Sequence, residues 1–102
     1  MNFIQQYQTE ITTLCIKHKV KELYAFGSVL DAKKFNENSD VDLIVKFDDK
    51  VVVEDYANLF FDFADNLEVL FKRKVDLMIS KPIKNRFLRA NIESTKQLVY
   101  AA

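Results

Sequence analysis

The spacing of the apolar side chains changes along this chain between the three- and four-residue steps of a helix and the short β-branched runs of a strand. Helical spacing covers residues 3–18 and 52–71, and it returns from Pro82 to about residue 94. Strand-like runs lie at 23–26, 41–47, 75–79 and 97–100. This order predicts one α/β domain of the α+β type over residues 1–102, a mixed sheet of about four strands with three helices mostly on one face.

Length and composition exclude several classes of protein. A chain of 102 residues that is 49% hydrophobic and 29% charged suits one folded domain and excludes disordered, collagen-like and coiled-coil chains. Fifteen basic residues balance fifteen acidic ones, which makes nucleic acid an improbable partner. The single Cys15 excludes an internal disulfide, and no stretch approaches the length of a membrane span. We therefore expect a cytoplasmic protein with no membrane partner.

Aspartates occupy alternate positions where two of the predicted strands begin. Asp40, which precedes the run VDLIVKF, and Asp42 within it share one face of the second predicted strand, and Asp76 holds the position in the run VDLMI that matches Asp42. If the two strands are neighbours, three carboxylates meet, and their mutual repulsion requires a cation. Mg²⁺ prefers oxygen ligands. The pattern therefore predicts that these aspartates are catalytic residues that bind one or two Mg²⁺ ions, with Mn²⁺ as a substitute, for phosphoryl transfer.

A single glycine stops the first predicted strand. Gly27 and Ser28 follow the apolar run at 23–26, in a turn that needs either positive φ or close backbone approach. Backbone N–H groups and a hydroxyl in such a turn can hold phosphates, so both residues are candidate nucleotide-binding residues. Residues 31–68 hold eleven acids and four bases, whereas residues 71–90 hold seven bases and one acid. This uneven charge suits a site where metal ions and phosphates meet.

These motifs resemble those of the minimal nucleotidyltransferases of the DNA polymerase β superfamily. The resemblance is carried by AFGS at 25–28, SDVDLIVKF at 39–47, KVDLMIS at 74–80 and the later Asn85, Leu88, Arg89 and Ile92. It implies that the three aspartates bind Mg²⁺ and that the Gly-Ser turn holds nucleotide phosphates. It also implies transfer of a nucleoside monophosphate, AMP from ATP or the equivalent from another nucleoside triphosphate, to a hydroxyl acceptor with release of pyrophosphate. Small members of this family often accompany a HEPN-type RNase toxin, so the resemblance implies an antitoxin with a HEPN-type protein partner.

The chain departs from the family pattern in the loop after Ser28. Asp31 stands where the family often has an arginine, and eleven residues instead of ten precede Asp40. This difference removes a phosphate contact and adds a negative charge. Candidate replacements for the contact are Lys33 and Lys34, with Lys46 and the basic residues 72–74 as further possibilities. The same departure favours an alternative function, a catalytically weak or inactive binding module that neutralises a partner protein by contact.

Several other residues have structural interpretations. His18 suits the C-terminal cap of the first helix, and Cys15 suits packing on the buried face of that helix. Phe63 has the spacing of a core residue, whereas Phe61 lies off the apolar stripe and is predicted to be exposed at an interface. The basic residues 72–74 complement the negative end of the second helix dipole.

Overall fold

The structure, a computed structural model, describes residues 3–30, 33, 35, 36, 38–80 and 96–102. In these residues the chain forms the α-helices α1 (Gln8–Lys17) and α2 (Val53–Phe71) and the strands β1 (Val20–Phe26), β2 (Val41–Phe47), β3 (Val75–Ile79) and β4 (Gln97–Ala101). Short 3-10 helices cover Gln5–Tyr7 and Gly27–Leu30. The predicted third helix and the four residues of the later family motif lie outside the described residues.

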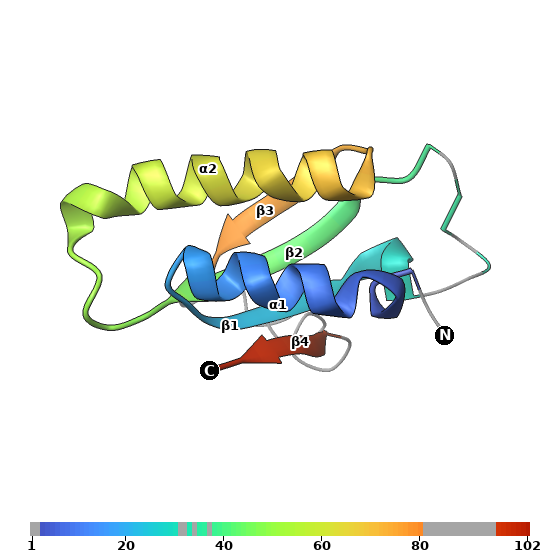
Figure 1. The fold of residues 1–102 in the computed structure, drawn as a ribbon. Coiled ribbons are helices and arrows are strands. Elements are labelled where there is room, and N and C mark those ends of the chain that lie inside the picture. The colour runs from blue at the N-terminus through green and yellow to red at the C-terminus, as the bar shows by residue number, and fades with distance from the viewer. Residues whose placement is uncertain (1–2, 31–32, 34, 37, 81–95) are drawn as a thin grey trace, which may run out of the picture.

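The four strands form one mixed sheet in the order β3-β2-β1-β4. β2 and β3 are parallel, with α2 as the crossover between them, whereas β1 is antiparallel to both β2 and β4. Both described helices lie side by side on one face of this sheet (Figure 1). The mixed sheet, its four strands and the one-sided placement of these helices confirm the predicted α+β fold.

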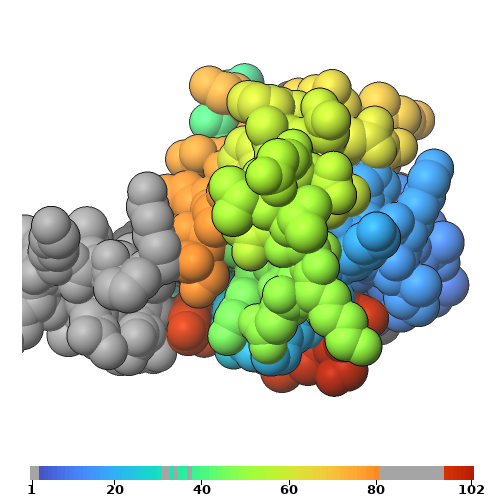
Figure 2. Space-filling model, turned by 90° about the vertical axis from the view of Figure 1, so that its left-hand side faces the viewer, coloured from blue at the N-terminus to red at the C-terminus, as the bar shows by residue number. Residues whose placement is uncertain are grey.

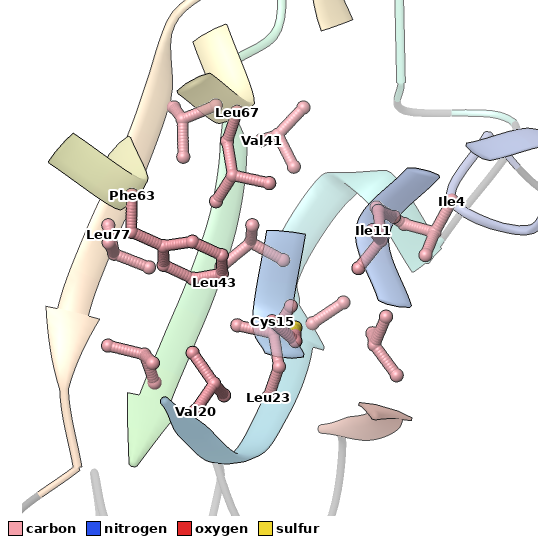
Figure 3. Packing of buried hydrophobic residues seen from close by; sticks show 14 of the residues in the cluster. Ile4, Ile11, Cys15, Val20, Leu23, Val41, Leu43, Phe63, Leu67 and Leu77 are labelled. Carbon is pink, nitrogen blue, oxygen red and sulfur yellow. The ribbon is translucent and has the colours of Figure 1, made fainter. Parts of the chain in front are cut away.

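The hydrophobic core lies between the helices and one face of the sheet. From α2, Phe63 and Leu67 point toward Leu43 on β2 and Leu77 on β3, and α1 supplies Cys15 on the other side (Figure 3). Phe63 is fully buried, because its position shares the inner stripe of α2 with Leu67 and Phe71. The odd positions of β2 face this core, as the two-residue period predicts.

A tight turn between α1 and β1 fixes where the first strand begins. Lys19 has a φ of 59°, a left-handed conformation that ends the helix, and β1 begins at the next residue rather than at 23 as predicted. His18 caps α1 as predicted, because its ring Nδ1 lies 2.7 Å from the Leu14 carbonyl oxygen. Its Nε2 lies 2.6 Å from an Asp62 carboxylate oxygen, which ties the end of α1 to α2. Both ring nitrogens therefore have partners, and His18 is buried.

The outer face of α2 is acidic and carries one large aromatic side chain. Phe61 is 64% exposed, as the sequence predicted, and its ring contacts Phe60 edge-on. Five acids and no base occur between Val53 and Phe71. The loop after β2 and the start of α2 lie at the left-hand end of the molecule in Figure 1, the end that faces the viewer in Figure 2. Among the described residues, no helix is both long and apolar enough to cross a membrane.

Candidate active site

The parallel pairing of β2 and β3 places two of the predicted aspartates side by side. Asp42 is the register partner of Asp76, and both lie on the face of the sheet away from the two described helices. Asp40 lies two residues before Asp42 and is half-buried. The neighbouring strands on which the cluster depends are therefore present. The sequence could not supply this pairing, because it contains no direct record of strand order.

The pKa of Asp42 reflects both its burial and the negative charges of its neighbours. Burial raises the pKa of this carboxyl above its ordinary value of 3.8, and the charges of Asp76 and then Asp40 raise it further. Asp42 is half-buried and Asp76 is exposed. The ionised form of Asp42 is thus opposed by its surroundings, and nearby positive charge would favour it.

Gly27 lies directly against the Asp42 carboxylate. Its φ is 77°, and a Cβ atom added there would lie 2.6 Å from the nearer carboxylate oxygen of Asp42. The antiparallel register explains this contact, because Phe26 pairs with Asp42 and the chain turns at the next residue. Both reasons that the sequence offered for glycine, positive φ and close approach, therefore apply. The closely approaching group is a carboxylate of the predicted metal site.

The three aspartates carry the donor atoms that Mg²⁺ prefers, although the structure does not gather them into one metal-binding group. Among the residues that the structure describes, no three His, Cys, Asp or Glu side chains are gathered closely enough to hold a metal ion. The donor set nevertheless consists of hard carboxylate oxygens, and the charges of Asp76 and Asp40 add to burial in raising the pKa of Asp42. A divalent cation would relieve that repulsion, so the residues fit a magnesium site in charge and in ligand type.

The candidate phosphate contacts are only partly described. Ser28 follows Gly27 in the short 3-10 helix Gly27–Leu30 and is half-exposed. Lys33 is exposed in the following loop, whereas Lys34 and Asp31 lie outside the described residues. Lys46 is exposed on β2 at the position that pairs with Glu22.

Arg73 is the residue near the site whose placement the sequence did not predict. Its guanidinium NH1 donates to the carbonyl oxygens of Asn36 and Ser39, both at 3.0 Å. The sequence assigned it to the helix dipole together with its basic neighbours, but the last turn of α2 has no basic residue. Lys72 follows that helix as its left-handed C-cap instead. A run of three basic residues gives no signal that distinguishes the middle one.

A cavity of about 430 Å³ lies at the other end of the strands, lined by Ile16, Lys19, Val20, Asp48, Lys50, Val51 and Tyr100. No residue predicted for the site lines this cavity. Cys15 is also outside the site, and its burial raises the thiol pKa to about 12, which leaves it as an unreactive packing residue.

Comparisons with known proteins bear on the family and the fold of the chain. The family model described as Polymerase beta, Nucleotidyltransferase matches residues 9–102. A Methanocaldococcus jannaschii protein that carries the name protein adenylyltransferase is 38% identical over 84 residues, which are 82% of this chain and 79% of that protein. A solved structure of tri-AMPylated Shewanella oneidensis HEPN toxin in complex with MNT antitoxin matches with a TM-score of 0.64 and 18% identity, over 98% of this chain and 74% of that chain. A structure described as a minimal nucleotidyltransferase matches with a TM-score of 0.66 and 25% identity, over 95% of both chains.

The contact between Gly27 and Asp42 predicts a coupling between the two positions. Gly27→Ala should destabilise the fold by about 1–2 kcal/mol through its left-handed φ alone, with a further loss from displacing the Asp42 carboxylate. In an Asp42→Ala background that further loss should disappear, giving a coupling of about 0.5–3 kcal/mol in urea unfolding of the four proteins. Additive losses would show that the two residues do not touch.

The raised pKa of Asp42 predicts a pH-dependent gain in stability for Asp42→Asn. Because the folded protein holds this proton more tightly than the unfolded chain does, ionisation costs stability as the pH rises above about 4. The melting temperature of Asp42→Asn should therefore exceed that of the wild type at pH 7, and the difference should shrink toward pH 3.

Asp49→Asn is the matched control for this measurement. A hydrogen bond from Lys21 and the charge of Lys21 lower the pKa of Asp49, so this variant should gain no stability at pH 7. A lower melting temperature for Asp42→Asn at every pH would contradict the repulsion.

Proposed function

Because the chain belongs to the polymerase β nucleotidyltransferase family, we propose that it transfers AMP from ATP to a hydroxyl group on a HEPN-type partner protein. In this transfer the hydroxyl oxygen bonds to the α-phosphorus of ATP. The bond from that phosphorus to the β-phosphate breaks, pyrophosphate leaves, and the hydroxyl proton is released to water. The product is an adenylylated partner, and the proposed role of the chain is that of its antitoxin.

Asp40, Asp42 and Asp76 are the residues that we assign to Mg²⁺, for which Mn²⁺ would substitute. When bound there, the ion would neutralise the triphosphate and favour departure of pyrophosphate. Asp42 is the central ligand in this assignment, because Asp76 pairs with it across the strands and Asp40 lies two residues earlier, just before β2 begins. The repulsion around Asp42 is the electrostatic reason to bind a cation here.

Gly27 and Ser28 are assigned to the phosphates of the nucleotide. The turn at Gly27 carries no side chain, so its backbone can approach a phosphate beside the Asp42 carboxylate. Lys33 and Lys34 are assigned as additional phosphate contacts that offset the negative charge of Asp31. The observation that carries the assignment as a whole is the placement of Gly27 against Asp42, with Asp76 as the strand partner of Asp42.

A protein acceptor is favoured over a nucleic acid. The M. jannaschii relative carries the name protein adenylyltransferase, and one structural neighbour was solved with an AMPylated HEPN toxin. The balanced charge of the chain lacks the basic excess of a nucleic-acid-binding domain. We further infer a cytoplasmic location, where ATP is available and the free, buried Cys15 stays reduced.

The test is to incubate the protein with its HEPN-type partner, Mg²⁺ and ATP labelled at either the α- or the γ-phosphate. Label from α-labelled ATP alone should enter the partner, and the mass of the partner should rise by one or more AMP groups. Asp42→Asn should reduce the rate by about 10²–10³-fold, because the cation that would stabilise the charge of the transition state loses a carboxylate ligand. Asp49→Asn, at the opposite end of β2, should transfer at the wild-type rate.

Two outcomes would contradict this proposal. Neutralisation of the partner without labelling would favour the contact-only binding module. Equal labelling of the partner by wild type and Asp42→Asn would show that Asp42 has no part in the transfer, which contradicts the assignment of the three aspartates to the metal.

A further inference from the structure

The Arg73 side chain joins two segments that carry the predicted metal ligands. Arg73 lies in the turn between α2 and β3, three residues before Asp76. Its NH1 donates to the carbonyl oxygens of Asn36 and Ser39, and Ser39 immediately precedes Asp40. One side chain therefore links the turn that precedes Asp76 to the residues that precede Asp40.

Two aromatic rings hold the guanidinium in place. Its central carbon lies 4.5 Å from the ring centroid of Phe35 and 4.8 Å from that of Phe3. The two rings also contact each other, with centroids 5.0 Å apart, and Phe3 packs on the buried Phe71. Cation–π contacts of this kind orient the planar guanidinium as well as attract it. Arg73 is therefore anchored to the core at the same time as it holds the loop.

The segment that Arg73 holds is itself a closed turn. The Ser39 amide donates to the Asn36 carbonyl at 3.0 Å, and the Asn36 amide donates to the Ser39 hydroxyl at 3.1 Å. Asn38 adds an amide hydrogen bond to the Asn36 side-chain oxygen at 2.8 Å. These hydrogen bonds tie Asn36, Asn38 and Ser39 together in what we call the 36–39 turn, and Arg73 joins these residues to the start of β3.

A backbone hydrogen bond holds Val41, the residue after Asp40, whereas the Arg73 side chain holds Ser39, the residue before it. The Val41 amide donates to the Lys74 carbonyl at 3.0 Å, and the Val75 amide donates to a Glu68 carboxylate oxygen at 2.9 Å. The first bond aligns β2 with β3 from Val41 onward, so it positions Asp42 against Asp76, and the second joins the start of β3 to α2. Asp40 precedes that ladder, and the Arg73 clamp ties Ser39, the residue before Asp40, to the start of β3.

We infer that Arg73 is a positioning residue for the metal site, where its clamp on the 36–39 turn sets Asp40 relative to Asp42 and Asp76. The inference rests on the proposed function in assigning the three aspartates to a metal. Arg73 contacts neither the metal nor the nucleotide in this account. Its removal should therefore act through the placement of Asp40. Outer residues that orient metal ligands are typically worth about 10–100-fold in metal affinity or activity.

The experiment compares wild type, Arg73→Lys, Arg73→Met and the control Lys21→Met. Lysine retains the charge but loses the planar fork that reaches two carbonyl groups, and methionine retains only the apolar stem. Lys21 is a cation in a surface ion pair with Asp49, at the end of β1 away from the site. Mn²⁺ affinity, measured by electron paramagnetic resonance titration, and amide hydrogen exchange of residues 39–41 are the readouts that do not need an active enzyme.

Arg73→Met should weaken Mn²⁺ binding by about 10-fold or more and speed amide exchange at residues 39–41. Arg73→Lys should fall between it and the wild type, and Lys21→Met should match the wild type. In the AMP-transfer assay, Arg73→Met should lower kcat and raise the Mg²⁺ concentration for half-maximal rate, with little change in KM for ATP.

Wild-type Mn²⁺ affinity in Arg73→Met, with only a lower melting temperature, would overturn the inference and leave Arg73 as a structural residue. Failure of the proposed function is a separate result. In that case wild type labels no partner, while Arg73→Met still weakens Mn²⁺ binding relative to wild type and so supports the positioning role.

Discussion

The parallel pairing of β2 with β3 is the constraint on which the site depends. Neighbouring strands lie about 4.8 Å apart, so the register that places Asp42 opposite Asp76 brings two negative charges together on the face of the sheet away from the two described helices. Burial and the neighbouring charges raise the pKa of Asp42, so the folded protein disfavours the ionised form of this carboxyl. On the proposed function this arrangement has a use, because a divalent cation bound there would relieve the same repulsion.

The remaining elements bring different groups to that pair. β1 runs antiparallel to β2 and ends with Phe26 opposite Asp42, so the turn at Gly27 falls against the carboxylate. α2 spans the crossover from β2 to β3 and packs Phe63 and Leu67 into the core, which fixes the two strands as neighbours. The helices thus hold one face of the sheet together, while the aspartates lie on the other face.

Much of this could be predicted from the sequence, for reasons that differ between residues. The two-residue period of VDLIVKF and VDLMI places Asp42 and Asp76 off the core face whatever the strand order is, and the structure confirms both strands. The single glycine indicates a turn with special backbone geometry. Its contact with Asp42 depends on the antiparallel register of β1 and β2, which the sequence does not record. Arg73 could not be found, because its contacts with Phe35 and the 36–39 turn join segments that are distant in sequence. The metal and nucleotide roles of the aspartates and of the Gly-Ser turn stay predictions.

Paramagnetic broadening of amide signals by Mn²⁺ tests the central claim most directly, namely that aspartates from β2 and β3 form one metal site beside Gly27. In a nuclear magnetic resonance titration with a non-hydrolysable ATP analogue present, the account predicts that the amides of Gly27, Asp42 and Asp76 broaden first. Those of Asp48 and Lys50, beyond the other end of β2, should stay sharp at the same Mn²⁺ concentration. Broadening that begins at the acidic outer face of α2, with Asp42 and Asp76 unchanged, would contradict the account.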